Sequence, residues 1–389
     1  MKSNYKPISE LVDRVDVRNT DRKIDILIGL SIDKCFIRSV ANTIGTDLTK
    51  YKVIRKKQFA VSLMQVSRDS KIPVACLQEF DAAIMSPAYS IFQVKDENVI
   101  LPEYLDIWFK RSEFDREAAF IAVGGVRGSM PWEDFARMKI RVPDIAEQRK
   151  IVKAYKTITD RIELKKRIND NLEATAQAIF QKQFAYYYGS DKLPNGYNIV
   201  SLDSLCTVKG GKRLPAGCEL LDTPTKHPYI RVRDIGSSRY VYLTDRFQYI
   251  DEETHSAISR YIVNTGDIVI SIVGTIGLLS KVHSSLDKAN LTENCVKLTD
   301  FHSVTSDYLY YTLCYKKQIK EIELLTVGAV QAKLPMYNIQ SMKILVPPTK
   351  VVEDFQNKMD VLNKQIEANT VEVQRLYELQ SVLLANLSD

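Results

Sequence analysis

Apolar residues recur at alternating spacings of three and four along two long stretches of the chain, 151–179 and 355–383. This spacing is the heptad pattern of helices that pack side by side. Each helix would have 35–40 residues and a length of about 55–60 Å. The expected interface residues of the helix pair are Ile151, Tyr155, Ile158, Ile162, Leu172, Ile179, Phe355, Met359, Leu362, Ile366, Val373, Leu376 and Leu383.

Both helices have start signals in the sequence. Asp144 follows Pro143 and precedes Glu147 by three residues, as in a capping box, and Thr349 is the expected cap of the second helix. Two apolar stripes in one chain most simply bury each other, which predicts an antiparallel coiled coil. Four polar residues interrupt the seams and would fix the register: Lys165, Asn169, Asn369 and Gln380. The alternative is a helix bundle in which these polar residues lie near solvent.

The sequence before each helix is also repeated, at an offset of 204 residues. Nine of the 21 residues in 123–143 are identical to their counterparts in 327–347, without a gap. A long duplication indicates two copies of one structural unit. The predicted class is therefore α+β, with two similar strand-rich domains, each followed by a long helix, in an internal pseudo-twofold repeat. The expected parts are domains 1–143 and 201–347, helices 144–184 and 348–389, and a linker over 185–200.

Composition describes an ordinary globular protein, with 45% hydrophobic and 26% charged residues in a chain of 389. No apolar run reaches the roughly 18 residues of a membrane span, and no signal peptide is apparent, so we expect a cytoplasmic protein without membrane contact. The six cysteines and four histidines lack zinc-ligand spacing, so no metal site is expected. The net charge of +6 is compatible with nucleic-acid binding.

Signatures of catalysis are missing from the sequence. There is no P-loop, no Asp-Pro-Pro-Tyr or Asn-Pro-Pro-Phe of an amino-methyltransferase, and no legible Ser-His-Asp or Cys-His arrangement. The segment 274–277 looks superficially like a nucleotide loop, but we expect a surface turn there. Pro143-Asp144 with Glu147 only faintly resembles a nuclease motif, since Arg149 stands where a lysine is needed. We therefore expect no catalytic residues and a recognition subunit rather than an enzyme.

The residues at the helix start resemble a known family. The stretch 142–152, Val-Pro-Asp-Ile-Ala-Glu-Gln-Arg-Lys-Ile-Val, is similar to the signature of the specificity subunit of a type I DNA restriction–modification system. The stretch 193–202 resembles the entry into that family's second target-recognition domain, with Tyr197 where Trp is common. The second helix departs from the pattern, because 349–355 lacks the Glu-Gln pair. The resemblance covers essentially the whole chain.

The resemblance implies a DNA-binding, non-catalytic subunit with two target-recognition domains. Each domain would read one half of a split asymmetric sequence in double-stranded DNA, and the helix pair would set the distance between the half-sites, about one DNA turn. It also implies two methyltransferase subunits, which bind S-adenosylmethionine, and restriction subunits with ATP-dependent translocase and nuclease activity. No cofactor is expected in this chain.

Candidate DNA contacts in the second domain are basic or amide residues in polar stretches. Lys and Arg suit phosphates and guanine edges, and Asn suits adenine edges. Arg231 and Arg233 are expected on one face of a strand over 229–234, with an ion pair to Asp234 as the alternative. The amides could equally cap turns. The candidates are Lys209, Lys212, Arg213, Arg231, Arg233, Asn290, Thr292, Asn294 and Lys333, of which Asn290, Thr292 and Asn294 would alternate along a strand.

In the first domain the candidates lie in two loops and one turn. A solvated turn is the alternative for Ser67–Lys71, and structural packing of Pro87-Ala88 is the alternative for the third group. The candidates are Ser67, Arg68, Lys71, Ser86, Tyr89 and Arg127. A competing hypothesis for the whole chain is a coiled-coil scaffold or regulator that binds protein partners without recognising a DNA sequence, and a stand-alone enzyme is the third.

Overall fold

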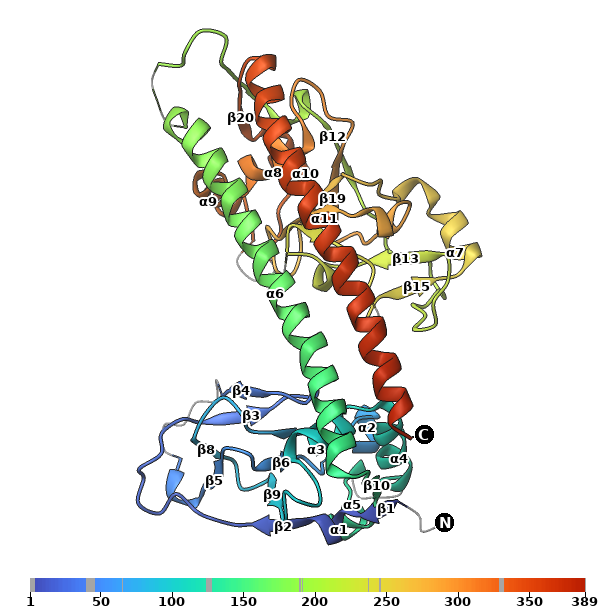
Figure 1. Ribbon diagram of the computed structural model, residues 1–389. Coiled ribbons are helices and arrows are strands. Elements are labelled where there is room, and N and C mark those ends of the chain that lie inside the picture. The colour runs from blue at the N-terminus through green and yellow to red at the C-terminus, as the bar shows by residue number, and fades with distance from the viewer. Residues whose placement is uncertain are drawn as a thin grey trace. The chain divides into compact units, whose positions relative to one another are not determined.

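The computed structural model describes residues 4–39, 46–64, 66–123, 128–188, 190, 192–236, 238–244, 246–328 and 332–388 (Figure 1). The chain divides into two compact units. The N-terminal unit combines Met1–Lys166 with Thr370–Asp389, and the C-terminal unit is Arg167–Asn369. The long helices α6 (Ile145–Phe184) and α11 (Thr349–Ala385) are each divided between the units. Each unit therefore consists of one strand-rich domain and one half of each long helix.

The sequence offset of 204 residues is reproduced by the helices. Three helix pairs begin at this offset: α3 (Pro102–Phe109) and α8 (Ser306–Leu313), α4 (Ser112–Ile121) and α9 (Lys316–Leu324), and α5 (Trp132–Arg137) and α10 (Met336–Ser341). The long helices α6 and α11 also begin 204 residues apart. The predicted α+β repeat, with a long helix after each strand-rich domain, is confirmed.

The N-terminal unit contains an antiparallel sheet and three strand pairs. The sheet has the order β2 (Val12–Val15), β9 (Ser90–Val94), β6 (Phe59–Val61) and β7 (Val74–Cys76). The pairs are β3 (Ile28–Leu30) with β4 (Phe36–Arg38), β5 (Lys52–Arg55) with β8 (Ala82–Met85), and β1 (Tyr5–Pro7) with β10 (Lys139–Arg141). Two short helices, α1 (Ile8–Leu11) and α2 (Val66–Asp69), complete the domain.

Aromatic side chains form the core between this sheet and the helices α3–α5. Phe59 and Phe92 stack with ring centroids 5.1 Å apart, and Phe109 of α3 meets Phe59 edge-on at 5.8 Å. Leu387, near the end of the chain, is 3% exposed in the same cluster. The end of the chain is thus part of the core of the N-terminal unit.

The C-terminal unit has a five-stranded sheet in the order β12 (Thr207–Gly210), β19 (Cys295–Thr299), β16 (Ile268–Ser271), β17 (Leu279–Val282) and β14 (Tyr240–Val241). A three-stranded sheet has the order β15 (Gln248–Ile250), β13 (His227–Ile230) and β18 (Asn290–Leu291). The first strand, β11 (Asn198–Ser201), pairs antiparallel with the last, β20 (Lys343–Val346), as β1 does with β10. Helix α7 (Glu252–Ala257) follows β15. The expected linker 185–200 contains a 3₁₀ turn over Ala185–Tyr187 and the start of β11.

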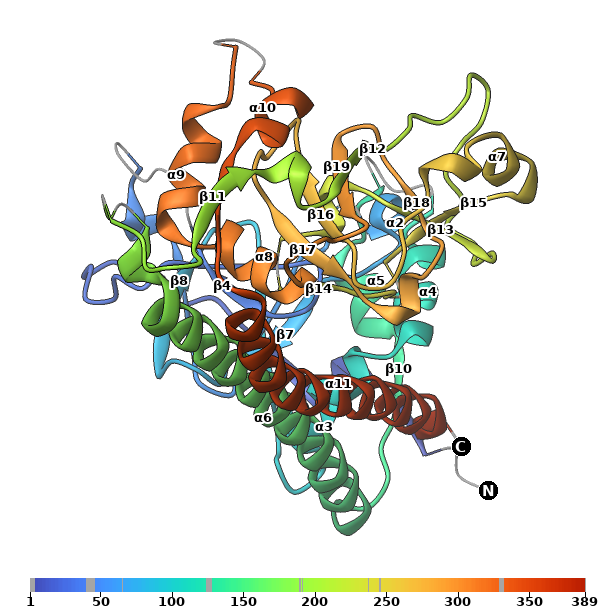
Figure 2. The ribbon, with the colours of Figure 1, turned by 90° about the horizontal axis from the view of Figure 1, so that it is seen from above.

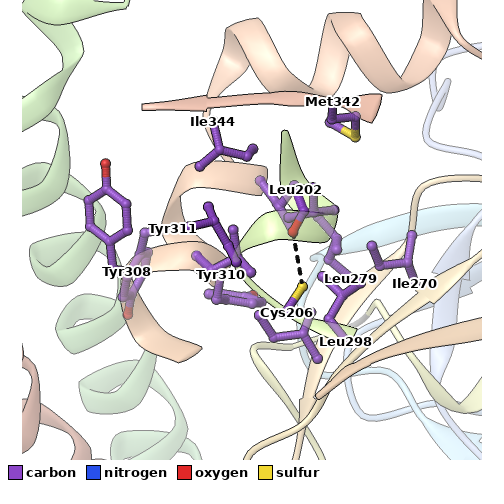
Figure 3. Packing of buried hydrophobic residues seen from close by; sticks show 14 of the residues in the cluster. Leu202, Cys206, Ile270, Leu279, Leu298, Tyr308, Tyr310, Tyr311, Met342 and Ile344 are labelled. Carbon is purple, nitrogen blue, oxygen red and sulfur yellow. Dashed lines mark hydrogen bonds between the residues drawn. The ribbon is translucent and has the colours of Figure 1, made fainter. Parts of the chain in front are cut away.

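The main core of this unit lies between the five-stranded sheet and α8. Figure 3 shows Ile270, Leu279 and Leu298 from the sheet packed towards Tyr310 of α8. Alternate residues of these strands face this core, as a half-buried sheet requires. The segment 274–277 is a turn from which no helix begins, as predicted.

The long helices run antiparallel within each unit. In the N-terminal unit, Gln380 Nε2 donates to Thr159 Oγ1 at 3.2 Å, and Lys165 Nζ lies 2.8 Å from Glu372 Oε2. In the C-terminal unit, Asn369 Nδ2 donates to Asn169 Oδ1 at 2.8 Å. Residue numbers rise along one helix as they fall along the other, so the predicted antiparallel pair is confirmed.

Most predicted interface residues are buried to some degree. Fully or nearly buried are Ile158, Ile162, Phe355, Met359 and Ile366. Packed against a domain core are Ile151, Tyr155, Ile179 and Leu362. Half-buried are Leu172, Val373, Leu376 and Leu383. Several seam residues thus also hold the domains on the helices.

The helix starts agree only in part with the prediction. The Asp144 carboxylate accepts the amide of Glu147 at 2.8 Å, which confirms Asp144 as the cap of α6. The Glu147 side chain pairs with Arg141 at 3.0 Å, so this acidic cluster supports a helix start and not a nuclease site. The expected cap at Thr349 is wrong, because α11 begins at that residue and Pro348 O accepts the amide of Val351 at 2.8 Å.

Replacing one member of the Asn169–Asn369 pair should be more harmful than replacing both. Asn369 is 1% exposed. Asn369→Leu alone leaves a polar group of Asn169 without this partner, and we expect a loss of about 1–3 kcal/mol in the free energy of unfolding. The double replacement by Leu should be close to neutral. Urea unfolding of both single variants and the double variant measures this coupling, and additive losses would contradict it.

Candidate nucleic-acid interface

A basic loop follows β12 in the C-terminal unit. Lys209, Lys212 and Arg213 are exposed, whereas the loop backbone is fixed: Lys212 N donates to Leu291 O at 2.8 Å. A Cβ on Gly211 would lie 2.0 Å from Thr292 O, so only glycine fits there. The close approach that this glycine allows is therefore to the domain's own backbone. The loop presents cations to solvent from a rigid support.

Two of these cations have neighbours on the surface. Arg213 Nε lies 2.7 Å from Glu293 Oε1, although the arginine side chain is 81% exposed. The hydrogen bond from Glu293 raises the pKa of Arg213. Lys212 Nζ lies 5.7 Å from the ring centre of Tyr261. An incoming phosphate would compete with Glu293 for Arg213, whereas Lys209 and Lys212 form no ion pair with a described residue.

The two arginines after β13 do not share a face. The expected strand over 229–234 is wrong beyond Ile230, because Val232–Asp234 forms a 3₁₀ turn. Arg231 is 14% exposed and donates to both Asp234 oxygens, at 3.0 and 3.2 Å, as the ion-pair alternative had it. Arg233 is 65% exposed and 3.9 Å from the same carboxylate. Of the two, only Arg233 presents its guanidinium to solvent.

The polar residues expected to alternate along a strand over 290–294 do not do so. Strand β18 ends at Leu291 and a turn follows. Asn290 is fully buried: its Oδ1 lies 2.7 Å from His255 Nδ1, and its Nδ2 donates to Ile258 O at 3.3 Å. Thr292 is 5% exposed, and Asn294 is half-buried. In this structure Asn290 and Thr292 serve the interior of the domain.

A histidine pair next to Asn290 was not singled out from the sequence. The rings of His227 and His255 stack with centroids 3.8 Å apart, and His227 Nε2 lies 2.8 Å from Glu252 Oε2. The two histidines are 28 residues apart on different elements, so no local motif signals the stack. Within the described ranges, no three His, Cys, Asp or Glu side chains are grouped to hold a metal ion.

Lys333 is exposed at the end of a two-residue ladder. Its backbone exchanges hydrogen bonds with Val327 at 2.8 Å in both directions and bridges to Val273. Lys333 thus lies beside the turn over 274–277 that follows β16. The structure does not report a contact between Lys333 and the loop over 209–213.

In the N-terminal unit, two of the candidate loops are neighbours. A Cβ on Gly128 would lie 2.5 Å from Ser67 Oγ and 3.3 Å from Arg68 N, and Gly128 has a φ of 73°. Arg68 is 66% exposed and pairs with Asp69 at 3.1 Å, and Lys71 lies 3.9 Å from Asp33. Arg127, the candidate of the second loop, lies outside the described residues. The adjacency of Ser67 and Gly128 could not be inferred from their separation in sequence.

Ser86 and Tyr89 form the turn between β8 and β9. Ser86 Oγ accepts the amide of Ala88 at 3.4 Å, and Tyr89 packs its ring against a buried cluster with its hydroxyl 3.5 Å from Leu30 N. Lys52 Nζ donates to Tyr89 O at 2.8 Å. These contacts favour the structural alternative for Tyr89.

The six cysteines are free thiols. Burial raises the pKa of Cys206 and of Cys295 to about 12, so both are protonated at neutral pH. Thiolate chemistry is thereby disfavoured at these two residues. Separately, none of the helices in the described part of the chain combines the length and apolar character of a membrane span.

Two repeated domains carrying exposed basic loops, each completed by both long helices, define a two-part recognition protein. A model of the type I restriction modification DNA specificity domain matches residues 37–174 and 194–379. These matches cover most of the chain, and the chain belongs to this family of type I restriction–modification specificity subunits. Recognition of a DNA target is the function of this family.

Individual relatives agree with this assignment. The chain is 22% identical over 301 residues to the type I restriction enzyme MjaIX specificity subunit of Methanocaldococcus jannaschii, covering 74% of this chain and 68% of the relative. It is 20% identical over 380 residues to the HindI specificity subunit of Haemophilus influenzae, covering 79% and 81%. The crystal structure of a type I S subunit from M. genitalium has the same fold, with a TM-score of 0.52 at 14% identity over 98% and 95% of the chains.

Proposed function

We propose that each recognition domain of this chain reads one half of a split asymmetric DNA sequence, with the helix pair setting the distance between the halves. The observation that carries the proposal is the repetition of the whole domain at a fixed offset, from α3 through the start of the long helix. Two copies of one fold with different loops can bind two different short sequences. A target with two unlike halves separated by a spacer follows.

The chain on its own is proposed to be non-catalytic and without a cofactor. Two methyltransferase subunits that bind S-adenosylmethionine would dock on the helix pair, and restriction subunits would supply ATP-dependent translocation and cleavage. The proposal places this assembly on double-stranded DNA in the cytoplasm. The adenine to be methylated must leave the duplex, so we expect DNA distortion near the half-sites.

Phosphate contacts and base contacts are assigned to different residues. Lys209, Lys212 and Lys333 are exposed cations without an ion pair among the described residues, which suits phosphates. Arg213 and Arg233 have exposed guanidinium groups, which suit a guanine edge. Arg68 and Lys71 are the corresponding candidates in the first domain, together with Ser67, Ser86 and Arg127. Asn290 and Thr292 are left out of this surface because they are buried.

Selection from a random duplex library tests the function. The full chain with its methyltransferase subunit should enrich two short unlike motifs at one fixed separation. A complex that contains active methyltransferase yet enriches no motif would support the scaffold hypothesis instead.

Removing two lysines of the basic loop should weaken DNA binding without changing the sequence preference. For Lys209→Ala with Lys212→Ala, the slope of log affinity against log salt should fall by about 2, since each phosphate contact contributes about 0.9. Fluorescence anisotropy over a salt series measures this slope. Lys320→Ala is the matched control, because Lys320 is an exposed lysine on α9 of the same unit. An unchanged slope in the double variant would remove this loop from the interface.

A further inference from the structure

One buried carboxylate in the C-terminal unit joins the recognition domain to α11. Asp307, in the first turn of α8, is 3% exposed. Its Oδ1 accepts hydrogen bonds from Arg239 and from Lys281, both of the recognition domain. Its Oδ2 accepts Gln356 Nε2 at 2.9 Å and Asn363 Nδ2 at 2.7 Å, both of α11. Four donors from three parts of the chain therefore meet at one side chain.

The same cluster reaches α6. Arg239 is 4% exposed, and its Nη1 lies 3.5 Å from Glu173 Oε1 of α6. Tyr311, one turn along α8 from Asp307, donates its hydroxyl to Glu173 Oε2 at 3.0 Å. The guanidinium of Arg239 also lies 5.0 Å from the ring centres of Tyr240 and Tyr311. Seen from above, α8 lies beside both long helices (Figure 2). We call this group the Asp307 cluster: Glu173, Arg239, Lys281, Asp307, Tyr311, Gln356 and Asn363.

The charges of the cluster require a defined geometry. Burial alone would raise the pKa of Asp307, but Lys281 and Arg239 outweigh this effect and hold the pKa below its ordinary value. The carboxylate is therefore ionised at neutral pH and its partners are fixed in direction. Charge-assisted hydrogen bonds of this kind depend on distance and angle, whereas an apolar contact tolerates small rotations. A buried ion cluster is weak evidence for stability but a good means of fixing one arrangement.

The N-terminal unit lacks a counterpart to the cluster. At the repeat offset, Asp307 corresponds to Glu103, Gln356 to Val152 and Asn363 to Thr159. There Val152 packs against the apolar core, and Thr159 bonds to Gln380 on the other long helix. The duplicated fold therefore does not need the Asp307 cluster in order to form. Its presence in one unit calls for a role specific to that unit.

We propose that Asp307 is a positioning residue that fixes the orientation of the second recognition domain on the long helices and thereby limits the half-site separation that the protein accepts. This inference rests on the proposed function. A domain that rotates on its support would bring its DNA-binding loops to a range of positions along the duplex. One base pair of separation changes both the distance, by about 3.4 Å, and the rotational phase of a half-site.

The test compares binding to duplexes that differ only in the separation of the half-sites. The complex with the methyltransferase subunit is titrated with the natural target and with targets lengthened or shortened by one base pair. Wild type should prefer the natural separation. Asp307→Asn, and independently Asn363→Leu with Gln356→Leu, should reduce this preference at least about tenfold, or about 1.4 kcal/mol, mainly through tighter binding to the altered separations.

Controls separate positioning from folding. Lys364→Gln changes an exposed residue next to Asn363 and should leave the preference unchanged. The paired replacement of Gln356 and Asn363 leaves Arg239 and Lys281 with Asp307, so it decides the matter if Asp307→Asn fails to fold. A preference that stays at the wild-type value, or affinities that fall equally for all separations, would overturn the proposal. Absence of sequence-selective binding by wild type would instead contradict the proposed function.

Discussion

Deletion of residues 370–389 should unfold the N-terminal unit, although these residues lie at the opposite end of the chain. Leu387 is 3% exposed in that unit's core, and Leu384 packs against the same cluster. Arg111, 4% exposed, donates its Nε to Leu384 O at 3.1 Å. The deletion also exposes Ile162 of α6. Each buried Leu or Ile contributes about 1.5–3 kcal/mol, so the loss should exceed about 5 kcal/mol.

Amide hydrogen exchange of the deleted chain measures this effect unit by unit. Protection should disappear from β2, β6 and β9 of the N-terminal unit while the five-stranded sheet of the C-terminal unit keeps its protection. Leu387→Ala is the graded version, with an expected loss of about 2–5 kcal/mol. Asn386→Ala, at an exposed neighbouring position, should have little effect. Full protection of β6 in the deleted chain would contradict the division into units that share both helices.

Phe355→Ala should destabilise the C-terminal unit by about 3–5 kcal/mol. Phe355 of α11 is fully buried among aromatic rings from α6 and α8. Its ring centre lies 5.4 Å from that of Phe184, 6.1 Å from that of Phe180 and 6.1 Å from that of Tyr308. The substitution removes the ring on which both long helices and the recognition domain meet. A cavity there cannot close without moving α6, α8 or α11.

Urea unfolding followed by tyrosine fluorescence or hydrogen exchange in α8 measures this loss. Val361→Ala is the matched control, because Val361 lies on the same helix and is 72% exposed, so its change should stay within about 0.5 kcal/mol. A Phe355→Ala protein as stable as the control would show that the aromatic cluster does not hold the domain on the helices.

The architecture was predictable because its signals are periodic. The heptad spacing and the offset of 204 residues are properties of the sequence alone, and helix starts follow them closely, as at Ile145 and Thr349. The polar interruptions Asn169 and Asn369 predicted a register-fixing pair, and the two side chains do bond to each other. Long regular patterns determine such features with little help from tertiary contacts.

The DNA-contact candidates were harder to predict because tertiary burial decides them. Asn290 has the composition of a surface reader, yet β18 places it between His255 and Ile258. Arg231 is removed from solvent by Asp234, which turns the chain away from a strand after Ile230. Irregular, short strands leave too few alternating residues for the period to show which side chains point outward.

The Asp307 cluster had no sequence signal at all. Asp307 lies 68 residues from Arg239 and 56 from Asn363. A charged residue at the start of a helix is ordinarily exposed and interacts with the helix dipole. Only the packing of α8 against both long helices identifies this carboxylate as a junction.

Single-molecule methylation sequencing tests the central claim most directly. Cells carrying this chain with its cognate methyltransferase subunit are compared with cells that carry the methyltransferase subunit alone. The account predicts N6-methyladenine in both halves of one split asymmetric motif, present only with this chain. Identical methylation in the two cell lines, with a methyltransferase shown to be active, would contradict it.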